Sequence, residues 1–340
     1  MRLRRSAVDG PGFRRVRRGR GFSYVSTSAA RRASVDAESL ERIEALVIPP
    51  AWKNVWICPY PNGHIQAIGT DAAGRRQYLY HERWQAERSE EKYDRALSLA
   101  KHLPAWRVQL LADLRGRGLG RDRVLALAQH LIDQGYFRAG GEEYAEENGS
   151  FGLATLLREH VHVHRDSVEF DYPAKSGVRR TVSLEDPLVI KAMRSLLRSE
   201  TRTPRLLAYR TSEGWCEVHA DDLNTRFREV VGEDFSVKDL RTWHGTVLAA
   251  EAFAIAREPT STTARRREEA AVMRAVAEEL GNTPAVARRS YVDPRVITAY
   301  EEGITIAPAL RRVRRQRTPE ARRETIERAT TRMIRRVAQS

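Results

Sequence analysis

The chain has 340 residues, enough for two domains and a sizeable core, and its 41% hydrophobic and 31% charged content excludes a disordered chain. No apolar run approaches the length of a membrane span, and the N-terminus lacks the apolar segment of a secretion signal. Lys and Arg total 59 against 45 acidic residues, a net charge of +14 that favours nucleic acid as a partner, although an arginine-rich genome alone could give this balance.

The first part of the sequence predicts a basic arm followed by a small β-rich domain. Residues 1–20 are rich in arginine and poor in apolar side chains, which is typical of a flexible arm. Residues 21–90 contain short strand-like runs separated by turn signals. Among them, residues 55–58 and 65–68 flank a Pro-Asn-Gly turn and predict a hairpin.

A further alternating strand is predicted after the turn at Gly74. It carries Gln77, Tyr78 and Tyr80, which are side chains suited to contacts in a DNA groove. A half-buried strand with ordinary aromatic packing explains each of them equally well.

From residue 91 to 305 the spacing of apolar residues predicts a mainly helical domain with a small sheet over 151–184. Strands are expected over 153–164 and 168–172. Residues 306–340 read as a basic helical tail without a clear apolar stripe. Helices within the domain are expected over 93–103, 104–114, 121–134, 187–197, 221–231, 237–256 and 265–280.

Two basic residues in this domain suit phosphate chemistry. Arg138 follows a predicted helix stop at Gly135 and precedes an acidic run, so carboxylates could hold it in place; an ordinary surface salt bridge is the alternative. Lys175 lies in a predicted hairpin turn over 173–177. It is either an exposed turn lysine or a mobile ammonium that donates a proton to a substrate.

Arg241 is predicted to sit rigidly in the second turn of a helix. Ser236 and Asp239 have the spacing of a capping box, which places the helix start just before the arginine. The apolar neighbours Leu240 and Trp243 argue against a simple surface position.

A short helix near the end of the domain presents a tyrosine. Thr283 suits the N-cap and Pro284 the first helical position, where a missing N–H costs nothing. Tyr291 follows about two turns later, beside Arg288 and Arg289. A phenol among guanidiniums suits attack on a phosphate better than packing in a core.

The ordered set Arg138, Lys175, Arg241, Asn282 and Tyr291 resembles the poxvirus-like type IB DNA topoisomerase family, in its bacterial branch. The resemblance runs from about residue 22 to 303 and includes Ile-Pro-Pro-Ala-Trp at 48–52, Pro-Asn-Gly-His at 61–64 and Lys-Asp-Leu-Arg-Thr at 238–242. It implies an α+β fold in which a small β-rich N-terminal domain precedes a larger, mainly α-helical catalytic domain of the tyrosine recombinase/type IB topoisomerase class.

The resemblance also implies a reaction. Tyr291 attacks a DNA phosphodiester to give a 3′-phosphotyrosyl link, and Arg138 and Arg241 neutralise the non-bridging oxygens. Asn282 adds a hydrogen bond, and Lys175 protonates the departing 5′ oxygen. Rotation of the free strand then relaxes positive and negative supercoils, with no ATP, metal ion or other cofactor expected.

Further expectations follow from the family. Gln77, Tyr78, Tyr80 and Tyr144 are expected to contact DNA. A monomer is expected to clamp duplex DNA between its two domains, without nucleotide or membrane partners, in the cytoplasm at the nucleoid. Viral and many eukaryotic members resemble this chain but carry histidine in place of Asn282, whose amide cannot act as an acid but can still donate a hydrogen bond to phosphate.

Two other functions fit part of the pattern. A tyrosine recombinase uses nearly the same constellation, but the β-rich N-terminal domain and the Thr242-Trp243 pair after Arg241, where recombinases usually have histidine, argue against it. A DNA-binding protein with an impaired site would explain Asn282, but not the presence of the other catalytic residue types.

Overall fold

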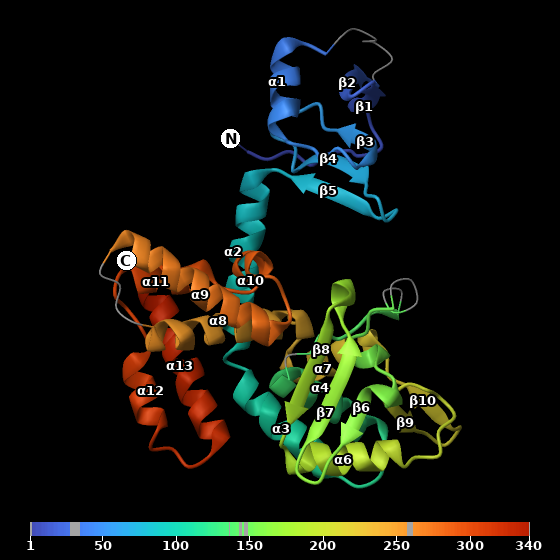
Figure 1. Cartoon of the computed structure of the whole chain (residues 1–340), viewed down its shortest axis with the longest axis vertical. Helices are drawn as coiled ribbons and strands as arrows, with labels where there is room; N and C mark the ends of the chain where they lie inside the picture. Colours follow the sequence, from blue (N-terminus) through green and yellow to red (C-terminus); the bar gives the residue numbers. More distant parts are fainter. Residues whose placement is uncertain are drawn as a thin grey trace. The chain divides into compact units, whose positions relative to one another are not determined.

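The structure, a computed structural model, describes residues 2–27, 35–135, 137–142, 145, 149–256 and 261–339. Its internal contacts divide the chain into two compact units, Met1–Lys92 and Tyr93–Ser340, and helix α2 (Glu82–Leu99) crosses the boundary (Figure 1). None of the described helices has the length and apolar character needed to cross a membrane. Within the same residues, no three His, Cys, Asp or Glu side chains gather as a metal site.

The N-terminal unit is built on a five-stranded antiparallel sheet in the order β2-β1-β3-β4-β5 (Figure 1). Helix α1 (Ala37–Ala45) starts after Asp36, whose side chain accepts a hydrogen bond from the Ser39 N–H, and buries Ile43 in the core of this unit. The strands are β1 (Phe13–Arg18), β2 (Gly21–Ser26), β3 (Lys53–Ile57), β4 (Ile65–Thr70) and β5 (Arg76–Tyr80). The predicted hairpin around the Pro-Asn-Gly turn is confirmed as β3 and β4.

The prediction of a flexible arm over residues 1–20 is wrong for β1, which pairs with both β2 and β3. Arg15 is buried, and its guanidinium donates to three backbone carbonyls, those of Ile48, Pro49 and Trp52. Alternate residues of a strand face opposite sides, so an inward-facing arginine cannot be told from its solvent-exposed neighbours by composition. The hydrogen bonds of the buried guanidinium are accepted by carbonyls of residues 48–52, which are distant in sequence.

The C-terminal unit is mainly helical, as predicted. Its longer helices are α3 (Leu103–Arg115), α4 (Arg121–Gly135), α6 (Pro187–Leu197), α7 (Ala220–Val231), α8 (Val237–Ile255), α9 (Thr262–Leu280) and α13 (Pro319–Val337). Three shorter ones are α10 (Pro284–Ser290), α11 (Pro294–Glu301) and α12 (Ala307–Val313). Together with the N-terminal sheet, they confirm the predicted fold class.

Two small sheets complete this unit. One has the order β6-β7-β8, with β6 (Val161–Val163), β7 (Val168–Pro173) and β8 (Arg179–Leu184); the other pairs β9 (Ala208–Arg210) with β10 (Trp215–Glu217). The long strand predicted over 153–164 is wrong for its first part, which forms two short 3-10 turns before β6. The pair β9–β10 was not predicted, because three-residue strands are too short to show a periodicity.

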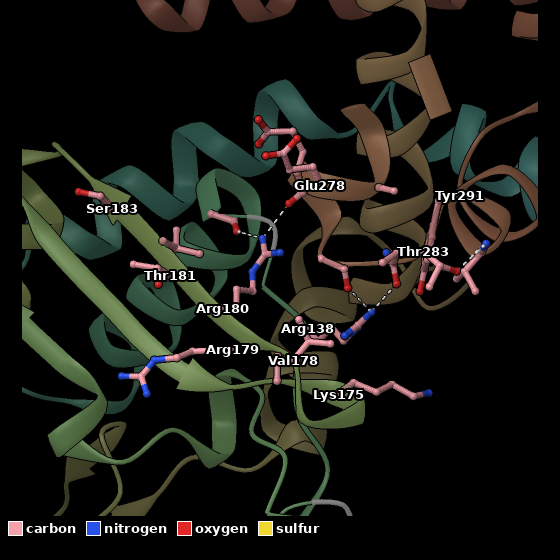
Figure 2. A pocket seen from close by; sticks show the side chains of 18 of the residues that line it. Arg138, Lys175, Val178, Arg179, Arg180, Thr181, Ser183, Glu278, Thr283 and Tyr291 are labelled. Atoms are coloured by element: carbon pink, nitrogen blue, oxygen red, sulfur yellow. Dashed lines mark hydrogen bonds between the residues drawn. The ribbon is translucent and has the colours of Figure 1, made fainter. Parts of the chain in front are cut away.

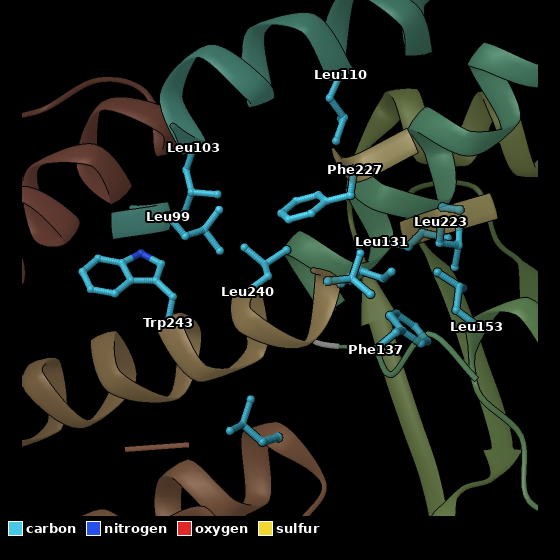
Figure 3. Packing of buried hydrophobic residues seen from close by; sticks show 14 of the residues in the cluster. Leu99, Leu103, Leu110, Leu131, Phe137, Leu153, Leu223, Phe227, Leu240 and Trp243 are labelled. Carbon is cyan, nitrogen blue, oxygen red and sulfur yellow. The ribbon is translucent and has the colours of Figure 1, made fainter. Parts of the chain in front are cut away.

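A continuous hydrophobic core joins the helices of this unit. Figure 3 shows Leu240 and Trp243 of α8 among leucines of α2, α3 and α4. Trp106 and Phe227 meet edge to face with ring centroids 5.2 Å apart. Because α8 is packed on so many neighbours, its side chains are held in fixed positions.

The predicted basic tail over 306–340 also joins this core. Helix α13 buries Ala329, Met333 and Ile334, and α12 buries Ala309. The apolar stripe was missed because arginines separate its few members and because α13 also buries a polar residue, Glu327.

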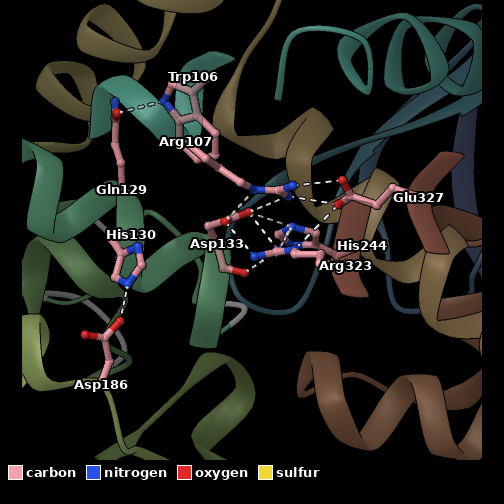
Figure 4. A network of polar contacts seen from close by, with 9 residues as sticks. All are labelled: Trp106, Arg107, Gln129, His130, Asp133, Asp186, His244, Arg323 and Glu327. Atoms are coloured by element: carbon pink, nitrogen blue, oxygen red, sulfur yellow. Dashed lines mark hydrogen bonds and ion pairs between the residues drawn. The ribbon is translucent and has the colours of Figure 1, made fainter. Parts of the chain in front are cut away.

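A buried polar network ties α13 to the core (Figure 4). The Asp133 carboxylate on α4 accepts from Arg107 Nε at 2.9 Å and from Arg323 Nη1 at 2.7 Å. Glu327 pairs with Arg107 at 2.8 Å, and His244 Nε2 lies 3.1 Å from Asp133 Oδ1. Burial lowers the pKa of His244 to about 4, so this imidazole is neutral at pH 7. Two arginines therefore balance two carboxylates.

Candidate active site

A groove of about 750 Å³ opens between three parts of the C-terminal unit (Figure 2). These parts are the end of α4 with the loop after it, the hairpin of β7 and β8, and the end of α9 with α10. Four of the five residues predicted to act together line this groove: Arg138, Lys175, Asn282 and Tyr291. The fifth, Arg241, lies against the ring of Tyr291.

Tyr291 follows directly on α10. The predicted start of this helix is confirmed, since the Thr283 hydroxyl accepts from the Val286 N–H and Pro284 occupies the first turn. The Tyr291 N–H donates to Ala287 O at 2.9 Å, which ties the tyrosine to the last turn. Its ring is therefore presented to the groove by a short, capped helix.

Arg241 is 4% exposed and lies in the second turn of α8. The predicted pairing of Ser236 with Asp239 is confirmed: the Asp239 carboxylate accepts from the Ser236 N–H at 2.9 Å. The guanidinium donates to Leu280 O at 2.7 Å, and its Cζ lies 5.2 Å from the centre of the Tyr291 ring. Burial and the nearby Arg138 lower the pKa of Arg241 to about 10, so it stays charged at pH 7.

The charge around Tyr291 favours ionisation of its phenol. Burial alone raises the pKa of Tyr291, but the guanidiniums of Arg241 and Arg138 outweigh it, and the pKa lies below the usual value. A lower pKa increases the fraction of phenolate, the form with the stronger nucleophilicity.

Arg138 points to the end of α9. Its Nη2 donates to Gly281 O at 3.1 Å and also to Asn282 Oδ1. The predicted carboxylate clamp stays a prediction, because Glu143, Glu146 and Glu147 lie outside the described residues; Glu142, the other acid of that run, contacts His219. Among the described residues, a backbone carbonyl and an amide oxygen accept hydrogen bonds from this arginine.

Oxygen atoms at the end of α9 thus accept hydrogen bonds from three arginines, which come from three different parts of the chain. Glu279 O accepts from Arg180, Leu280 O from Arg241, and Gly281 O and Asn282 Oδ1 from Arg138. We call these four oxygens of residues 279–282 the α9 rim. Gly281 has φ +59°, a left-handed conformation that glycine adopts at helix ends, and this turn places successive oxygens in different directions.

Lys175 begins a single 3-10 turn at the tip of the β7–β8 hairpin, where the sequence predicted a turn. Its side chain is exposed and lines the groove. Figure 2 shows it in the same groove as Arg138 and Tyr291. A lysine at such a tip can reach a bound ligand without disturbing the core.

The predicted DNA contacts of the N-terminal unit lie on β5. Tyr78 and Tyr80 stack with ring centroids 5.9 Å apart and are 39% and 37% exposed, so they are available to a ligand. Gln77 Nε2 donates to Asp71 Oδ2 at 2.9 Å. Tyr144, the fourth predicted contact, lies outside the described residues.

Arg180 was missed by the sequence analysis. It lines the same groove, and its Nη2 donates to Glu279 O at 2.8 Å and to Gly135 O at 3.3 Å. Arg179 and Arg180 are adjacent on a strand, so they face opposite sides of it. The sequence could have indicated that one of the two turns inward, but not which one.

Gly245 provides a test of how tightly the tyrosine is held. A Cβ at this position of α8 would lie 2.8 Å from Tyr291 O and 2.9 Å from Tyr291 Cβ, closer than atoms can approach. We expect Gly245→Ala to displace Tyr291 and to slow the cleavage of DNA that the sequence resemblance implies about 100-fold in a single turnover, since misplacement by about 1 Å has this effect. Gly120→Ala, where nothing lies within 4 Å, is the control. A wild-type cleavage rate in Gly245→Ala would show that Tyr291 needs no fixed backbone.

Arginines beside a phenol can stabilise the negative charge that develops at phosphorus, as a protein of the phosphoryl-transfer class requires. The pattern described as eukaryotic DNA topoisomerase I, catalytic core, matches residues 81–317, and that of the bacterial DNA topoisomerase IB N-terminal domain matches residues 21–71. DNA topoisomerase 1B of Acanthamoeba polyphaga mimivirus is 30% identical over 275 residues, which cover 78% of this chain and 81% of that protein.

Two plant proteins are similar over a smaller part. DNA topoisomerase 1 beta of Arabidopsis thaliana is 26% identical over 159 residues, 46% of this chain and 16% of that protein. DNA topoisomerase 1 alpha of the same plant is 26% identical over 163 residues, which cover 47% of this chain and 17% of that protein.

The chain belongs to the type IB DNA topoisomerase family. It is accordingly an isomerase that acts on duplex DNA, and the predicted family is confirmed. The two alternatives, a recombinase and a non-catalytic DNA-binding protein, gain no support from these matches.

Proposed function

We propose that Tyr291 is the nucleophile with which this topoisomerase cuts one DNA strand. The phenol gives its proton to solvent water, its oxygen forms a bond to the phosphorus, and the bond from phosphorus to the 5′ oxygen breaks. The product is a 3′-phosphotyrosyl link and a free 5′-hydroxyl strand. The observation that carries this proposal is the position of the Tyr291 ring, 5.2 Å from the Arg241 guanidinium and in one groove with Arg138.

Arg138 and Arg241 are proposed to bind the two non-bridging oxygens of the scissile phosphate. Both guanidiniums meet the α9 rim, so their positions are set before DNA arrives. Asn282 is proposed to donate a further hydrogen bond. Its amide has two N–H bonds; Nδ2 lies 3.3 Å from Leu280 O, and the second N–H can serve a phosphate oxygen.

Lys175 is proposed as the general acid. As the bond to the 5′ oxygen breaks, its ammonium transfers a proton to that oxygen, a contribution of roughly 10²–10⁴-fold to the rate. In religation the same lysine, now neutral, takes the proton back as the 5′ oxygen attacks the phosphotyrosyl bond. Its exposed position at a hairpin tip suits a group that must meet a large ligand.

Because one phosphodiester is exchanged for another, the bond energy is kept in the covalent intermediate. We therefore propose that relaxation needs neither nucleotide nor divalent metal, and that rotation of the free strand removes supercoils of either sign. We also propose that a monomer suffices, since all five site residues come from one chain, and that Gln77, Tyr78, Tyr80 and Tyr144 contact DNA.

A plasmid assay tests the proposal. We expect the purified protein to relax negatively and positively supercoiled plasmid in EDTA without nucleotide, as read from the distribution of topoisomers on a gel. Light scattering of the active sample gives its oligomeric state. A shift in plasmid mobility without relaxation would instead identify a DNA-binding protein, and strand exchange between separate duplexes would identify a recombinase.

A further inference from the structure

The proposed reaction gives no role to Arg180, an arginine of the groove on β8 that contacts both of the other parts that form the groove. It lies on β8 and is half-buried. Its guanidinium donates to Gly135 O, three residues before Arg138, and to Glu279 O, three residues before Asn282. One side chain thus bridges the ends of α4 and α9.

The same side chain also fixes the base of the lysine hairpin. Arg180 is paired across the sheet with Tyr172 of β7, and the Tyr172 phenol is hydrogen-bonded to Arg180. Tyr172 is buried and packs on Phe137, with ring centroids 6.1 Å apart. Lys175 lies between these two residues of the hairpin, at its tip.

A positive charge at Arg180 is energetically unfavourable, because the side chain is half-buried and a second guanidinium, that of Arg138, lies near it. Burial lowers the pKa of Arg180, and the charge of Arg138 lowers it further. Arg180 in turn contributes to the lowered pKa of Arg241. The guanidiniums of Arg138, Arg180 and Arg241 repel one another, whereas a neutral side chain at position 180 would not add to this repulsion. Backbone oxygens of the α9 rim accept hydrogen bonds from Arg180 and Arg241.

We propose that Arg180 is a positioning residue that aligns the Lys175 hairpin with the arginines of the groove. This inference rests on the proposed function, in which Lys175 protonates the 5′ oxygen. The planar guanidinium suits the task because it offers donors in fixed directions, whereas a lysine ammonium would not hold two carbonyls and a phenol in one geometry. Without Arg180, Lys175 remains at the hairpin tip but is no longer aligned with the scissile phosphate.

A DNA substrate with sulfur in place of the bridging 5′ oxygen separates this role from others. Tyr291 attacks the phosphorus as before, and the bond from phosphorus to sulfur breaks. The sulfur leaves with the electron pair as a thiolate, which is stable unprotonated because thiols ionise near about pH 8.5. Variants that impair only proton donation are therefore slow on the oxygen substrate and nearly normal on the sulfur substrate.

Single-turnover cleavage is measured on both substrates for Arg180→Ala, Arg180→Lys and Lys175→Ala. We expect both Arg180 variants to be slowed about 10- to 100-fold on the oxygen substrate, a part of the general-acid contribution, and less than about threefold on the sulfur substrate. Arg180→Lys keeps the charge, so it remains informative if Arg180→Ala fails to fold. Thermal unfolding of each variant checks that the protein is intact.

The adjacent Arg179 supplies a matched control. It lies on the same strand, is exposed and pairs with Asp171, and Figure 2 shows it pointing away from Arg180. Arg179→Ala removes the same charge and an ion pair within the hairpin, but none of the hydrogen bonds to the ends of α4 and α9. We expect its ratio of oxygen to sulfur cleavage rates to equal that of the wild type.

The outcomes separate this inference from the proposed function. If Lys175→Ala is equally slow on both substrates, lysine is not the acid and the proposed function fails at that step. If sulfur rescues Lys175→Ala but leaves Arg180→Ala slow, Arg180 only stabilises the end of α9 or binds phosphate, and the inference is overturned. Full activity of Arg180→Lys on the oxygen substrate would also overturn it, because charge alone would then suffice.

Discussion

Replacing Tyr291 by phenylalanine is expected to abolish plasmid relaxation while leaving DNA affinity nearly unchanged. The substitution removes one oxygen, the atom proposed to attack phosphorus, and keeps the ring against Arg241. Loss of a covalent nucleophile lowers turnover by about 10⁶-fold in enzymes of other classes, which here means a rate below detection. The measurements are topoisomer distributions and the protein–DNA adduct trapped with detergent.

Tyr209→Phe is the matched control for this substitution. Tyr209 is a half-buried tyrosine on β9, outside the groove, so the loss of its hydroxyl should leave relaxation intact. A covalent adduct that persists in Tyr291→Phe would move the nucleophile to another residue and end the proposed mechanism.

The second large effect concerns stability. We expect Asp133→Asn to lower the free energy of unfolding by about 3–5 kcal/mol, because it leaves a buried positive charge without its partner. Asp133 is 1% exposed and accepts from Arg107 and Arg323, which join α3 and α13 to α4. Urea unfolding followed by circular dichroism measures the difference between the two proteins.

The effect should depend on pH in a defined direction. Burial opposes ionisation of Asp133, but Arg323, Arg107 and His244 outweigh it, and its pKa lies well below the usual value. Its contribution is therefore complete above the unfolded pKa of about 4 and is lost as the pH falls through the folded pKa. The gap between wild type and Asp133→Asn should close in acid.

An exposed ion pair provides the comparison for Asp133→Asn. Glu324 pairs with Arg328 four residues later on the surface of α13. Glu324→Gln should change the unfolding free energy by less than about 0.5 kcal/mol. A similarly small change for Asp133→Asn would mean that the buried network is not needed to dock α13.

Local signals allowed part of the fold to be predicted. The Thr283-Pro284 start of α10, the pairing of Ser236 with Asp239 and the hairpin of β3 and β4 each depend on residues close in sequence. Helix α2 begins at Glu82, well before the predicted residue 93, because its first turns are polar and show little apolar periodicity. The spacing of apolar residues therefore cannot locate the start of this helix.

The remaining features depend on contacts between distant segments. Arg15 looks like a member of a charged run, and only the carbonyls of residues 48–52 reveal it as buried. Arg323 meets Asp133 across 190 positions, and no local pattern links them. For the site, the sequence could name residue types suited to phosphate chemistry, but the groove that gathers four of them, and the place of Arg180 in it, required the structure.

The α9 rim has a consequence for how DNA is received. Its oxygens belong to the negative end of a helix dipole and, apart from one amide, to the main chain itself. Carbonyls attract cations less strongly than carboxylates do, so guanidiniums that donate to this rim keep more of their attraction for a phosphate. We therefore expect the rim to orient these guanidiniums without neutralising their charge.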